Sequence, residues 1–176
     1  MRQLSQIRAA TAEAKIQFLV IGGWAVCAHG YARLTKDLDL LGRKEDREKW
    51  NAVLGEIGYI SVFQPPSFGH WNPAQLPGYT VLDVMFVNDA TFQKMFQAAR
   101  EVSVEGTESK IPSLEHLIAL KVHALHHGGE RRLLKDYDDL NNLITVNKVD
   151  TKSEWFRDVC MKFGTTDIYE RLRGKI

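Results

Sequence analysis

Acids and leucines alternate in the segment Asp37–Leu41, which reads DLDLL. A period of two is typical of a β-strand, because successive side chains of a strand point to opposite faces. We therefore expect Asp37 and Asp39 to project from one face of a strand, while the leucines enter a core on the other. Two carboxylates this close repel each other unless a cation lies between them or one is protonated. The segment predicts a strand whose polar face meets a cation.

A glycine pair precedes this strand. The apolar run Gln17–Ile21 (QFLVI) ends at Gly22 and Gly23, which predicts a short buried strand, a tight turn and then a short helix. Glycine lets the backbone approach a phosphate closely, and the N–H groups at a helix start attract an anion. Arg33 and Thr35 stand between the glycines and the acids, within reach of the same triphosphate. The segment therefore predicts a phosphate cradle next to the paired acids.

A third acid lies in the strongest predicted strand. Asp83 stands inside Tyr79–Val87 (YTVLDVMFV). Burying a lone charge in a strand is costly unless the charge is paired or bound to a metal. If this strand pairs with the strand of Asp37 and Asp39, the three carboxylates converge. Carboxylate oxygens are the ligands that Mg²⁺ prefers, together with substrate phosphates.

The remaining patterns predict an αβ core followed by helices. Helices are predicted up to about residue 15, over 44–57 and over 90–99, with a strand over 59–63 and a hairpin-like stretch up to 111. The segment 64–78 holds four of the five prolines and is expected to be a loop. Further helices are predicted at about 113–127, 130–145 and 151–162. We expect an α+β fold with a small mixed sheet flanked by helices, in a core of residues 1–111, and a C-terminal helical region over 112–176.

Composition narrows the setting. The chain has 176 residues, a formal net charge of +1 and two cysteines, Cys27 and Cys160, which have no metal-ligand spacing. A near-neutral chain gives no strong evidence for a nucleic-acid partner. The polar N-terminal segment lacks the apolar run of a signal peptide or membrane span. We therefore expect a cytoplasmic protein with reduced cysteines and no membrane partner.

The spacing of these motifs matches a known superfamily. Between Gly22 and Asp39 the order is GGWA, HG, Arg, Thr and Asp-Leu-Asp, and a later strand carries a single Asp. This order resembles the nucleotidyltransferase superfamily that includes DNA polymerase β. The chain most resembles the AbiEii-type nucleotidyltransferase toxins of bacterial toxin–antitoxin and phage-defence systems. Lys121 in LIALKVHAL and the segment Lys135–Leu140 (KDYDDL) match further motifs of those toxins. The resemblance covers about Phe18–Leu143.

The resemblance implies the nucleotidyltransferase fold and a reaction. A nucleoside monophosphate would pass from a nucleoside triphosphate (NTP) to a hydroxyl, and pyrophosphate would leave. Asp37 and Asp39 would bind two Mg²⁺ ions, and Asp83 would assist a metal ion or activate the acceptor hydroxyl. Gly22 and Gly23 would cradle the triphosphate. Most of the catalysis would come from positioning and charge neutralisation.

The resemblance also implies that Lys121, as a catalytic residue, and Asp136, as a nucleotide ligand, reach the nucleotide from the helical region. Lys121 lies at helical spacing with Ile118 and Leu125 on an apolar face. A lysine in such a stripe either bonds a polar partner or extends its amine to solvent. Asp136 lies at the edge of another apolar stripe, where an inward pair with Lys121 or Arg33 is the alternative interpretation.

Three functions remain open at this stage. In the first, the acceptor is RNA such as tRNA, or a protein, and the enzyme is a toxin with a cognate antitoxin as partner. In the second, the acceptor is an aminoglycoside or lincosamide antibiotic, because enzymes of that kind carry a similar GGWA segment. In the third, the chain is a non-catalytic nucleotide-binding or partner-binding module. Lys121 and Asp136 favour the first function, and the three acids argue against the third.

Overall fold

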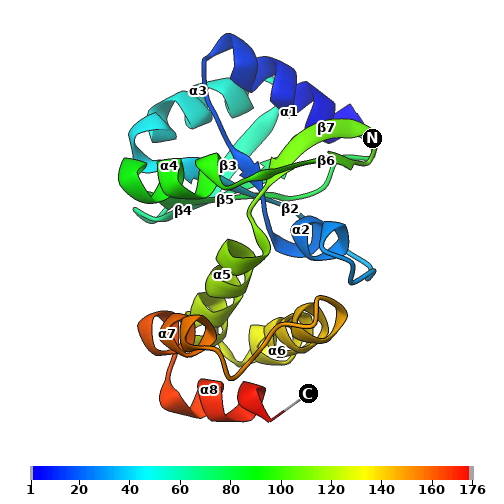
Figure 1. Ribbon diagram of the computed structural model, residues 1–176. Helices are drawn as coiled ribbons and strands as arrows, with labels where there is room; N and C mark the ends of the chain where they lie inside the picture. Colours follow the sequence, from blue (N-terminus) through cyan, green and yellow to red (C-terminus); the bar gives the residue numbers. More distant parts are fainter. Residues whose placement is uncertain (1, 175–176) are drawn as a thin grey trace. The chain divides into compact units, whose positions relative to one another are not determined.

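The computed structural model describes residues 2–174 and places them in two compact units, whose elements are labelled in Figure 1. The first unit runs to Ala25 and resumes over Arg33–Ser113. The second unit combines Val26–Ala32 with the chain from Leu114 onward. A short segment from the first part of the sequence therefore belongs to the helical unit.

The first unit is built on a sheet. Within residues 2–174 its five strands have the order β1-β2-β5-β4-β3. They are β1 (Leu19–Val20), β2 (Leu38–Arg43), β3 (Tyr59–Phe63), β4 (Phe68–Pro73) and β5 (Leu82–Val87). β2 and β5 are parallel, and the other neighbouring pairs are antiparallel. With the flanking helices, this mixed sheet confirms the predicted α+β fold.

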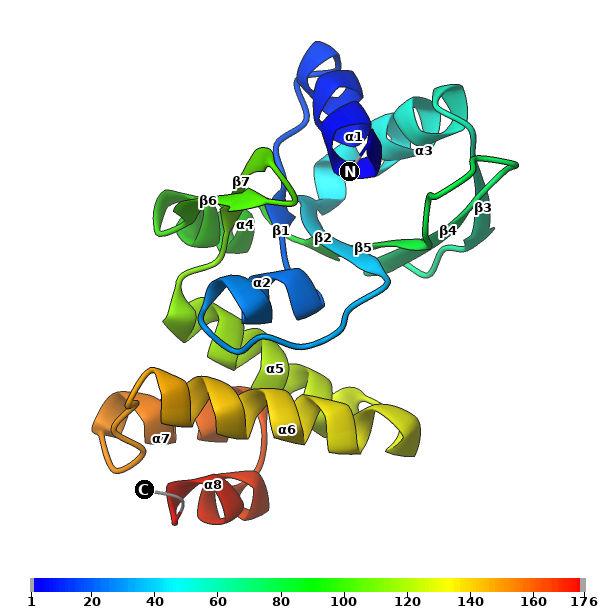
Figure 2. The ribbon, with the colours of Figure 1, turned by 90° about the vertical axis from the view of Figure 1, so that its right-hand side faces the viewer.

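Helices and a hairpin surround this sheet. They are α1 (Arg2–Glu13), the short 3₁₀ turn η1 (Lys44–Asp46), α3 (Arg47–Glu56), α4 (Asp89–Gln97) and the hairpin of β6 (Arg100–Val104) with β7 (Thr107–Ile111). α1 and α3 lie side by side over one face of the sheet (Figure 2).

Contacts of β2 with α3 fix which face of the sheet carries the acids. A Cβ at Gly42 would lie 2.9 Å from Nε1 of Trp50 in α3, so Gly42 packs directly against that helix. Leu40 shares the face of Gly42 by the period of two. Asp39 therefore lies on the opposite face of the sheet, away from α3.

The prediction that residues 64–78 form a loop is wrong, because they contain β4. This strand pairs with β3 on one side and β5 on the other. The prolines stand before the strand, at its last residue and after it, where they do not interrupt the pairing. Trp71 is 1% exposed and belongs to the core. Its indole lies over Gly69, where a Cβ would be 2.2 Å from Cη2 of Trp71.

The second unit is helical. It contains α5 (Leu114–His127), α6 (Glu130–Val146), α7 (Glu154–Phe163) and α8 (Thr166–Arg173). Their apolar faces form one buried cluster that includes Ile118, Val122, Leu140, Ile144, Phe156 and Leu172. Ser153 and Thr165 cap α7 and α8, because each side chain accepts a hydrogen bond from a backbone N–H of its helix.

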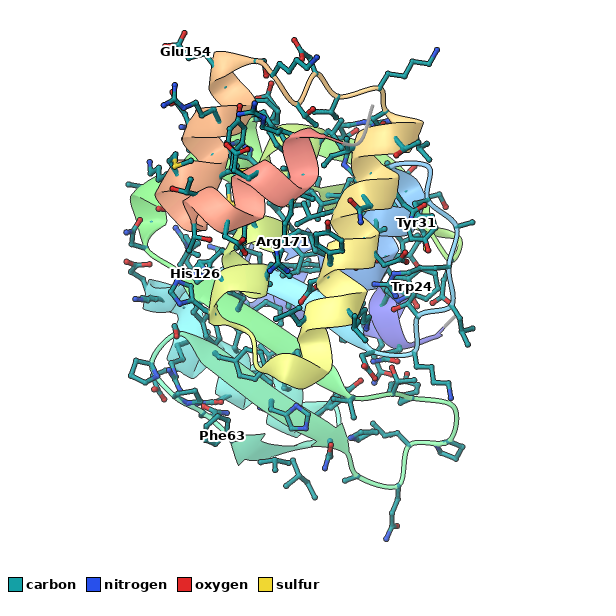
Figure 3. The ribbon with its side chains drawn as sticks, turned by 90° about the horizontal axis from the view of Figure 1, so that it is seen from below. Trp24, Tyr31, Phe63, His126, Glu154 and Arg171 are labelled. Atoms are coloured by element: carbon teal, nitrogen blue, oxygen red, sulfur yellow. The ribbon has the colours of Figure 1, made fainter. Side chains whose placement is uncertain are left out.

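The segment Val26–Ala32 is fastened to α6. Tyr31 lies beside α6 (Figure 3), and its hydroxyl donates a hydrogen bond to Oδ2 of Asp138 over 2.6 Å. Nδ2 of Asn147 donates to the carbonyl oxygen of His29 over 3.0 Å. The helix α2 (Gly22–Ala28) therefore begins in the first unit and ends in the second.

No helix within residues 2–174 is long and apolar enough to cross a membrane.

Candidate active site

Three polar side chains form a row across neighbouring strands of the sheet. Asp39 of β2 lies in register with Asp83 of β5, and His70 of β4 lies in register with Asp83 from the other side. Residues directly opposite each other on paired strands share a face of the sheet. The two acids and the histidine therefore project together from the face opposite α3. The expected pairing of the Asp83 strand with the Asp39 strand is present.

Gly22 packs against the first acid of this row. Gly22 has a φ of +59°, and a Cβ there would lie 1.9 Å from Oδ2 of Asp39. The backbone N–H of Ile21 donates to the carbonyl oxygen of Asp39 over 2.9 Å. Both the backbone conformation and the close approach require glycine at this position. The turn after β1 is thereby held against the Asp39 carboxylate.

Gly23 contacts the two residues that stand between the glycines and the acids. A Cβ at Gly23 would lie 2.4 Å from Oγ1 of Thr35 and 3.0 Å from Nη1 of Arg33. The Arg33 guanidinium also donates to the carbonyl oxygen of Leu34. The structure therefore brings the glycine turn, a guanidinium, a hydroxyl and a carboxylate into one place.

His70 contacts the neighbouring acid of the row. Its Nδ1 lies 2.6 Å from Oδ1 of Asp83. The Asp83 side chain is 11% exposed and the His70 side chain is 31% exposed. His70 is not among the site residues predicted from the sequence, because residues 64–78 were expected to be a loop. The available signal was the strand-forming pair Phe68 and Trp71 between the prolines.

The third predicted metal ligand, Asp37, is exposed and lies immediately before β2. Within residues 2–174 no group of three or more His, Cys, Asp or Glu side chains is arranged to hold a metal ion. Mg²⁺ needs only one or two protein carboxylates when substrate phosphates supply other ligands. Asp39 and Asp83, adjacent on one face, therefore fit such an ion by their donor chemistry.

Lys121 and Asp136 belong to the second unit, where they contact each other. Nζ of Lys121 lies 2.8 Å from Oδ1 of Asp136 and 2.6 Å from Oδ2 of Asp139. The Lys121 side chain is 10% exposed, and the Asp139 side chain is fully buried. Of the two sequence interpretations of Lys121, the one with a polar partner describes the structure. Asp136 forms the inward pair with Lys121.

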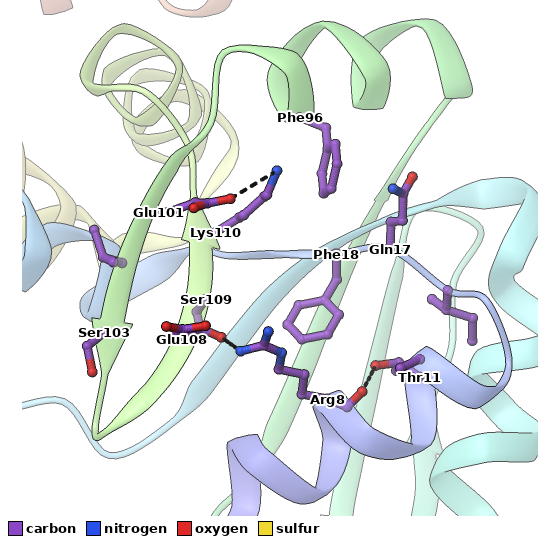
Figure 4. Close-up of a pocket in the computed structure, with 13 residues that line it drawn as sticks. Arg8, Thr11, Gln17, Phe18, Phe96, Glu101, Ser103, Glu108, Ser109 and Lys110 are labelled. Carbon is purple, nitrogen blue, oxygen red and sulfur yellow. Dashed lines mark hydrogen bonds and ion pairs between the residues drawn. The ribbon is translucent and has the colours of Figure 1, made fainter.

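A cavity of about 510 Å³ lies elsewhere in the first unit (Figure 4). Its lining comes from α1, α4, the β6–β7 hairpin and the segment before β1, and includes Arg8, Thr11, Phe18, Phe96, Glu101 and Lys110. Nζ of Lys110 lies 4.6 Å from the ring centroid of Phe96 and 3.7 Å from Oε1 of Glu101. Phe18 precedes β1 and Gly22 follows it, so the cavity and the glycine turn lie at opposite ends of that strand.

A glycine turn and two neighbouring carboxylates on a mixed sheet are the parts that an enzyme of phosphate transfer needs. The chain belongs to the family described as uncharacterised nucleotidyltransferases, whose sequence model matches residues 1–172. It is thus a nucleotidyltransferase, and the predicted superfamily is confirmed. Enzymes of this class use a nucleoside triphosphate, generally with a divalent metal ion. No curated protein matches the chain by sequence.

Solved structures share the fold. The lincosamide antibiotic adenylyltransferase LnuA, in its lincomycin-bound form, is 21% identical with a TM-score of 0.58, covering 82% of this chain and 96% of that one. The antibiotic-resistance factor ANT(2'')-Ia is 18% identical with a TM-score of 0.60, covering 97% and 87%. An antigenic nucleotidyltransferase-like protein from Paracoccidioides brasiliensis is 18% identical with a TM-score of 0.54, covering 98% and 92%. The TM-scores show that these proteins share the fold of this chain.

Proposed function

We propose that the protein transfers a nucleoside monophosphate from a nucleoside triphosphate to a hydroxyl group, with Mg²⁺ as its metal ion. The observation that carries this proposal is the register of Asp39 with Asp83, with Gly22 packed against the Asp39 carboxylate. Two adjacent carboxylates are destabilised by repulsion unless a cation joins them. A phosphate-bound cation satisfies both the acids and the triphosphate.

The proposal gives the acids a common task. Asp39 and Asp83, with Asp37 just before β2, would hold up to two Mg²⁺ ions. When bound, the ions would neutralise the charge that develops on the phosphate oxygens. The exposed position of Asp37 suits a ligand that meets its ion only together with the substrate. The binding of NTP and of metal would then depend on each other.

The glycine turn and its neighbours would receive the triphosphate. Gly22 and Gly23 present backbone without side chains, so phosphate oxygens can approach their N–H groups. The Arg33 guanidinium and the Thr35 hydroxyl lie against the same turn. A guanidinium is suited to phosphate because its donors form a planar fork. These four residues would orient the phosphorus atom that reacts.

The proposed reaction is a displacement at the α-phosphorus of the triphosphate. The acceptor oxygen forms a bond to this phosphorus, and the bond from the phosphorus to the oxygen bridging to the β-phosphate breaks. Pyrophosphate leaves with the electrons of that bond. The hydroxyl proton would pass to the Asp83 carboxylate, which acts as the base. Asp83 would therefore serve the acceptor as well as the metal.

The proposed roles of Lys121 and Asp136 stay predictions from the family resemblance. In the structure the Lys121 amine is shared by Asp136 and Asp139, and the Lys121 side chain is almost completely buried. A structural role explains these contacts fully. A role at the nucleotide would require the amine to exchange at least one of the two carboxylates for a phosphate.

The first candidate acceptor is a macromolecule, either RNA such as tRNA or a protein. Its support is the resemblance of Lys121 and of the segment Lys135–Leu140 to the AbiEii-type toxins. In this proposal the enzyme acts in the cytoplasm as a toxin or defence factor and has a cognate antitoxin as partner. A reducing compartment agrees with Cys27 and Cys160, neither of which the structure joins in a disulfide bond.

The second candidate acceptor is a small polyhydroxylated molecule such as an antibiotic. Its support is the likeness of fold to LnuA and ANT(2'')-Ia, which extends over most of each chain. A further structure of ANT(2'')-Ia contains adenylyl-2''-tobramycin, with a TM-score of 0.54 and 18% identity over 98% of this chain and 94% of that one. Structures of this fold thus include an adenylyltransferase of lincosamide antibiotics and a complex with an adenylylated aminoglycoside.

The decisive experiment offers every acceptor class at once. The protein is incubated with Mg²⁺ and each of the four NTPs labelled at the α-phosphate, with total tRNA, cell protein, or a panel of aminoglycosides and lincosamides. The control is the double variant Asp37→Ala with Asp39→Ala. We expect label on one acceptor class, lost in the double variant, which also selects between the two candidates. Binding of NTP with metal but no transfer would indicate a non-catalytic module, and no binding at all would refute the proposal.

A further inference from the structure

His70 stands at the end of the carboxylate row, at a position to which no role has been assigned. The row runs from Asp39 through Asp83 to His70 on strands β2, β5 and β4. β4 pairs with β5 in regular register at His70, and on its other side His70 lies opposite Phe63, where the register with β3 shifts. The imidazole is thus presented to Asp83 by a strand of the sheet and not by a loop.

The contact between the two side chains has a defined direction. Nδ1 of His70 lies 2.6 Å from Oδ1 of Asp83, and an ionised carboxylate only accepts hydrogen bonds, so in the tautomer with a hydrogen on Nδ1 the imidazole is the donor. A bond of 2.6 Å to a side chain that is only 11% exposed restricts rotation of the carboxylate plane. The orientation of Asp83 is therefore set by His70 from one side of the row.

Carboxylates that bind metal ions are generally held by hydrogen bonds from neighbouring groups, and removal of such a group costs about 10–100-fold in metal affinity or activity. Asp83 has such a donor in His70, on the strand opposite to the one that carries Asp39. An imidazole is suited to this place because it donates without adding a fixed positive charge beside the metal.

We infer that His70 is a positioning residue for nucleotidyl transfer, which orients the Asp83 carboxylate toward the metal ion and the acceptor hydroxyl through its Nδ1–H. This inference rests on the proposed function. It predicts that the hydrogen-bond donor matters, and not the imidazole as such. An asparagine at this position places an amide donor close to where Nδ1 lies, whereas leucine fills the space without a donor.

The test compares His70→Leu with His70→Asn, with Asn72→Ala as the matched control in the same strand. Asn72 is exposed and has no place in the proposed site. The first measurement is Mn²⁺ binding by electron paramagnetic resonance in the presence of each α,β-methylene NTP, which cannot be turned over. The second is steady-state kinetics on the acceptor found above. Circular dichroism melting checks the fold of each variant.

We expect His70→Leu to weaken Mn²⁺ binding by about 10–100-fold and to lower kcat by a similar factor, with KM for the NTP at saturating Mg²⁺ changed by less than about threefold. His70→Asn should recover most of both, and Asn72→Ala should match the wild type. Wild-type Mn²⁺ affinity in His70→Leu would overturn the inference, as would equal losses in the leucine and asparagine variants. If His70→Leu does not fold, His70→Gln replaces it, because the glutamine amide extends beyond the position of Nδ1. Equal Mn²⁺ affinity of the Gln and Asn variants would then overturn the inference.

The experiment distinguishes failure of the proposed function from failure of the role inferred for His70. Mn²⁺ binding that depends on both Asp39 and His70, without transfer to any acceptor, would refute the proposed function but would support the part of the inference in which His70 orients Asp83 toward the metal ion. Mn²⁺ binding that is unchanged in both Asp39→Asn and His70→Leu would overturn both.

Discussion

The two units of the molecule differ in the side chains that contact their clustered acids. In the helical unit, Asp136 and Asp139 share the ammonium group of Lys121, so the chain itself supplies the positive charge. In the sheet unit, Asp39 and Asp83 are neighbours on paired strands, and Asp83 contacts the imidazole of His70. The first cluster contains a permanent cation, whereas the second contains a histidine side chain.

Under the proposed function, this difference separates acids that stabilise the fold from acids that bind the metal ion and the substrate. A buried ion pair with a lysine stabilises only while both partners remain, since loss of one leaves an uncompensated charge. Adjacent carboxylates on a sheet are unfavourable until a cation arrives. Removal of one charge should therefore lower the stability of the helical unit and leave that of the sheet unit unchanged or higher.

The largest effect is expected for Lys121→Met. This change leaves two buried carboxylates without their cation and should lower the free energy of unfolding by about 3–5 kcal/mol. The exposed Lys135, in the same motif, is the matched control, and Lys135→Met should change stability by less than about 0.5 kcal/mol. Urea denaturation measures both. If Lys121→Met lowers the free energy of unfolding by less than about 1 kcal/mol, the Lys121 cluster does not stabilise the helical unit as we expect.

Asp39→Asn should show the reverse pattern. Nucleotidyl transfer should fall by about 10²–10³-fold, because a group that stabilises charge in the transition state is lost. The melting temperature should stay the same or rise, because one of two neighbouring like charges is gone. Activity assays and thermal melting of the same preparation check both parts. Destabilisation as large as that of Lys121→Met would show that Asp39 is a structural acid.

Gly22→Ala is expected to have an intermediate effect. Its Cβ would collide with the Asp39 carboxylate, at a backbone φ of +59°. Gly106 also has a positive φ, of +78°, but nothing lies within 4 Å of its Cβ. Gly106→Ala should therefore cost about 1 kcal/mol from the backbone alone, and Gly22→Ala should cost about 2–3 kcal/mol and reduce NTP binding. Equal costs and unchanged NTP binding in the two variants would argue against contact between the turn and Asp39.

The smallest effect concerns pH and the helical unit. Burial, followed by the proximity of His127 and His126, lowers the pKa of His123. Protonation is therefore easier in the unfolded chain, so His123 contributes stability above a pH of about 6.5 that is lost as the pH falls below it. The melting temperature should drop between pH 7.5 and 5.5, and His123→Gln should drop less. A steeper fall in the variant would contradict this sign.

Much of the site could be predicted from local patterns. The alternation of Asp37–Leu41 and the glycine pair indicate a strand and a turn whatever the rest of the chain does, because both depend on neighbours in sequence. Asp83 stands out because a charge in an apolar strand is costly. The pairing of Lys121 with Asp136 was one of two interpretations, since helical spacing places both at apolar faces but says nothing about their partner.

The part that sequence reasoning missed depends on pairing between distant segments. β4 has no strong period of two, and its prolines indicate a loop, yet β3 and β5 provide hydrogen-bond partners on both sides. Tertiary pairing overrode local propensity there. His70 can be recognised as a site residue only from its register with Asp83. Asp139 can be recognised as a partner of Lys121 only from the contact between the two side chains. Neither register nor contact is visible in a single segment.

The parallel pairing of β2 with β5 also has a consequence for when the site comes into being. The two strands are separated in the chain by α3, β3 and β4, so they cannot meet through a local hairpin. Closure of such long segments is slow compared with formation of helices and hairpins. During synthesis, a chain that has not yet emerged beyond β5 has the glycine turn and Asp39 but no carboxylate opposite them. The enzyme should thus become competent only late in folding, in a single step that brings the neighbouring acids together.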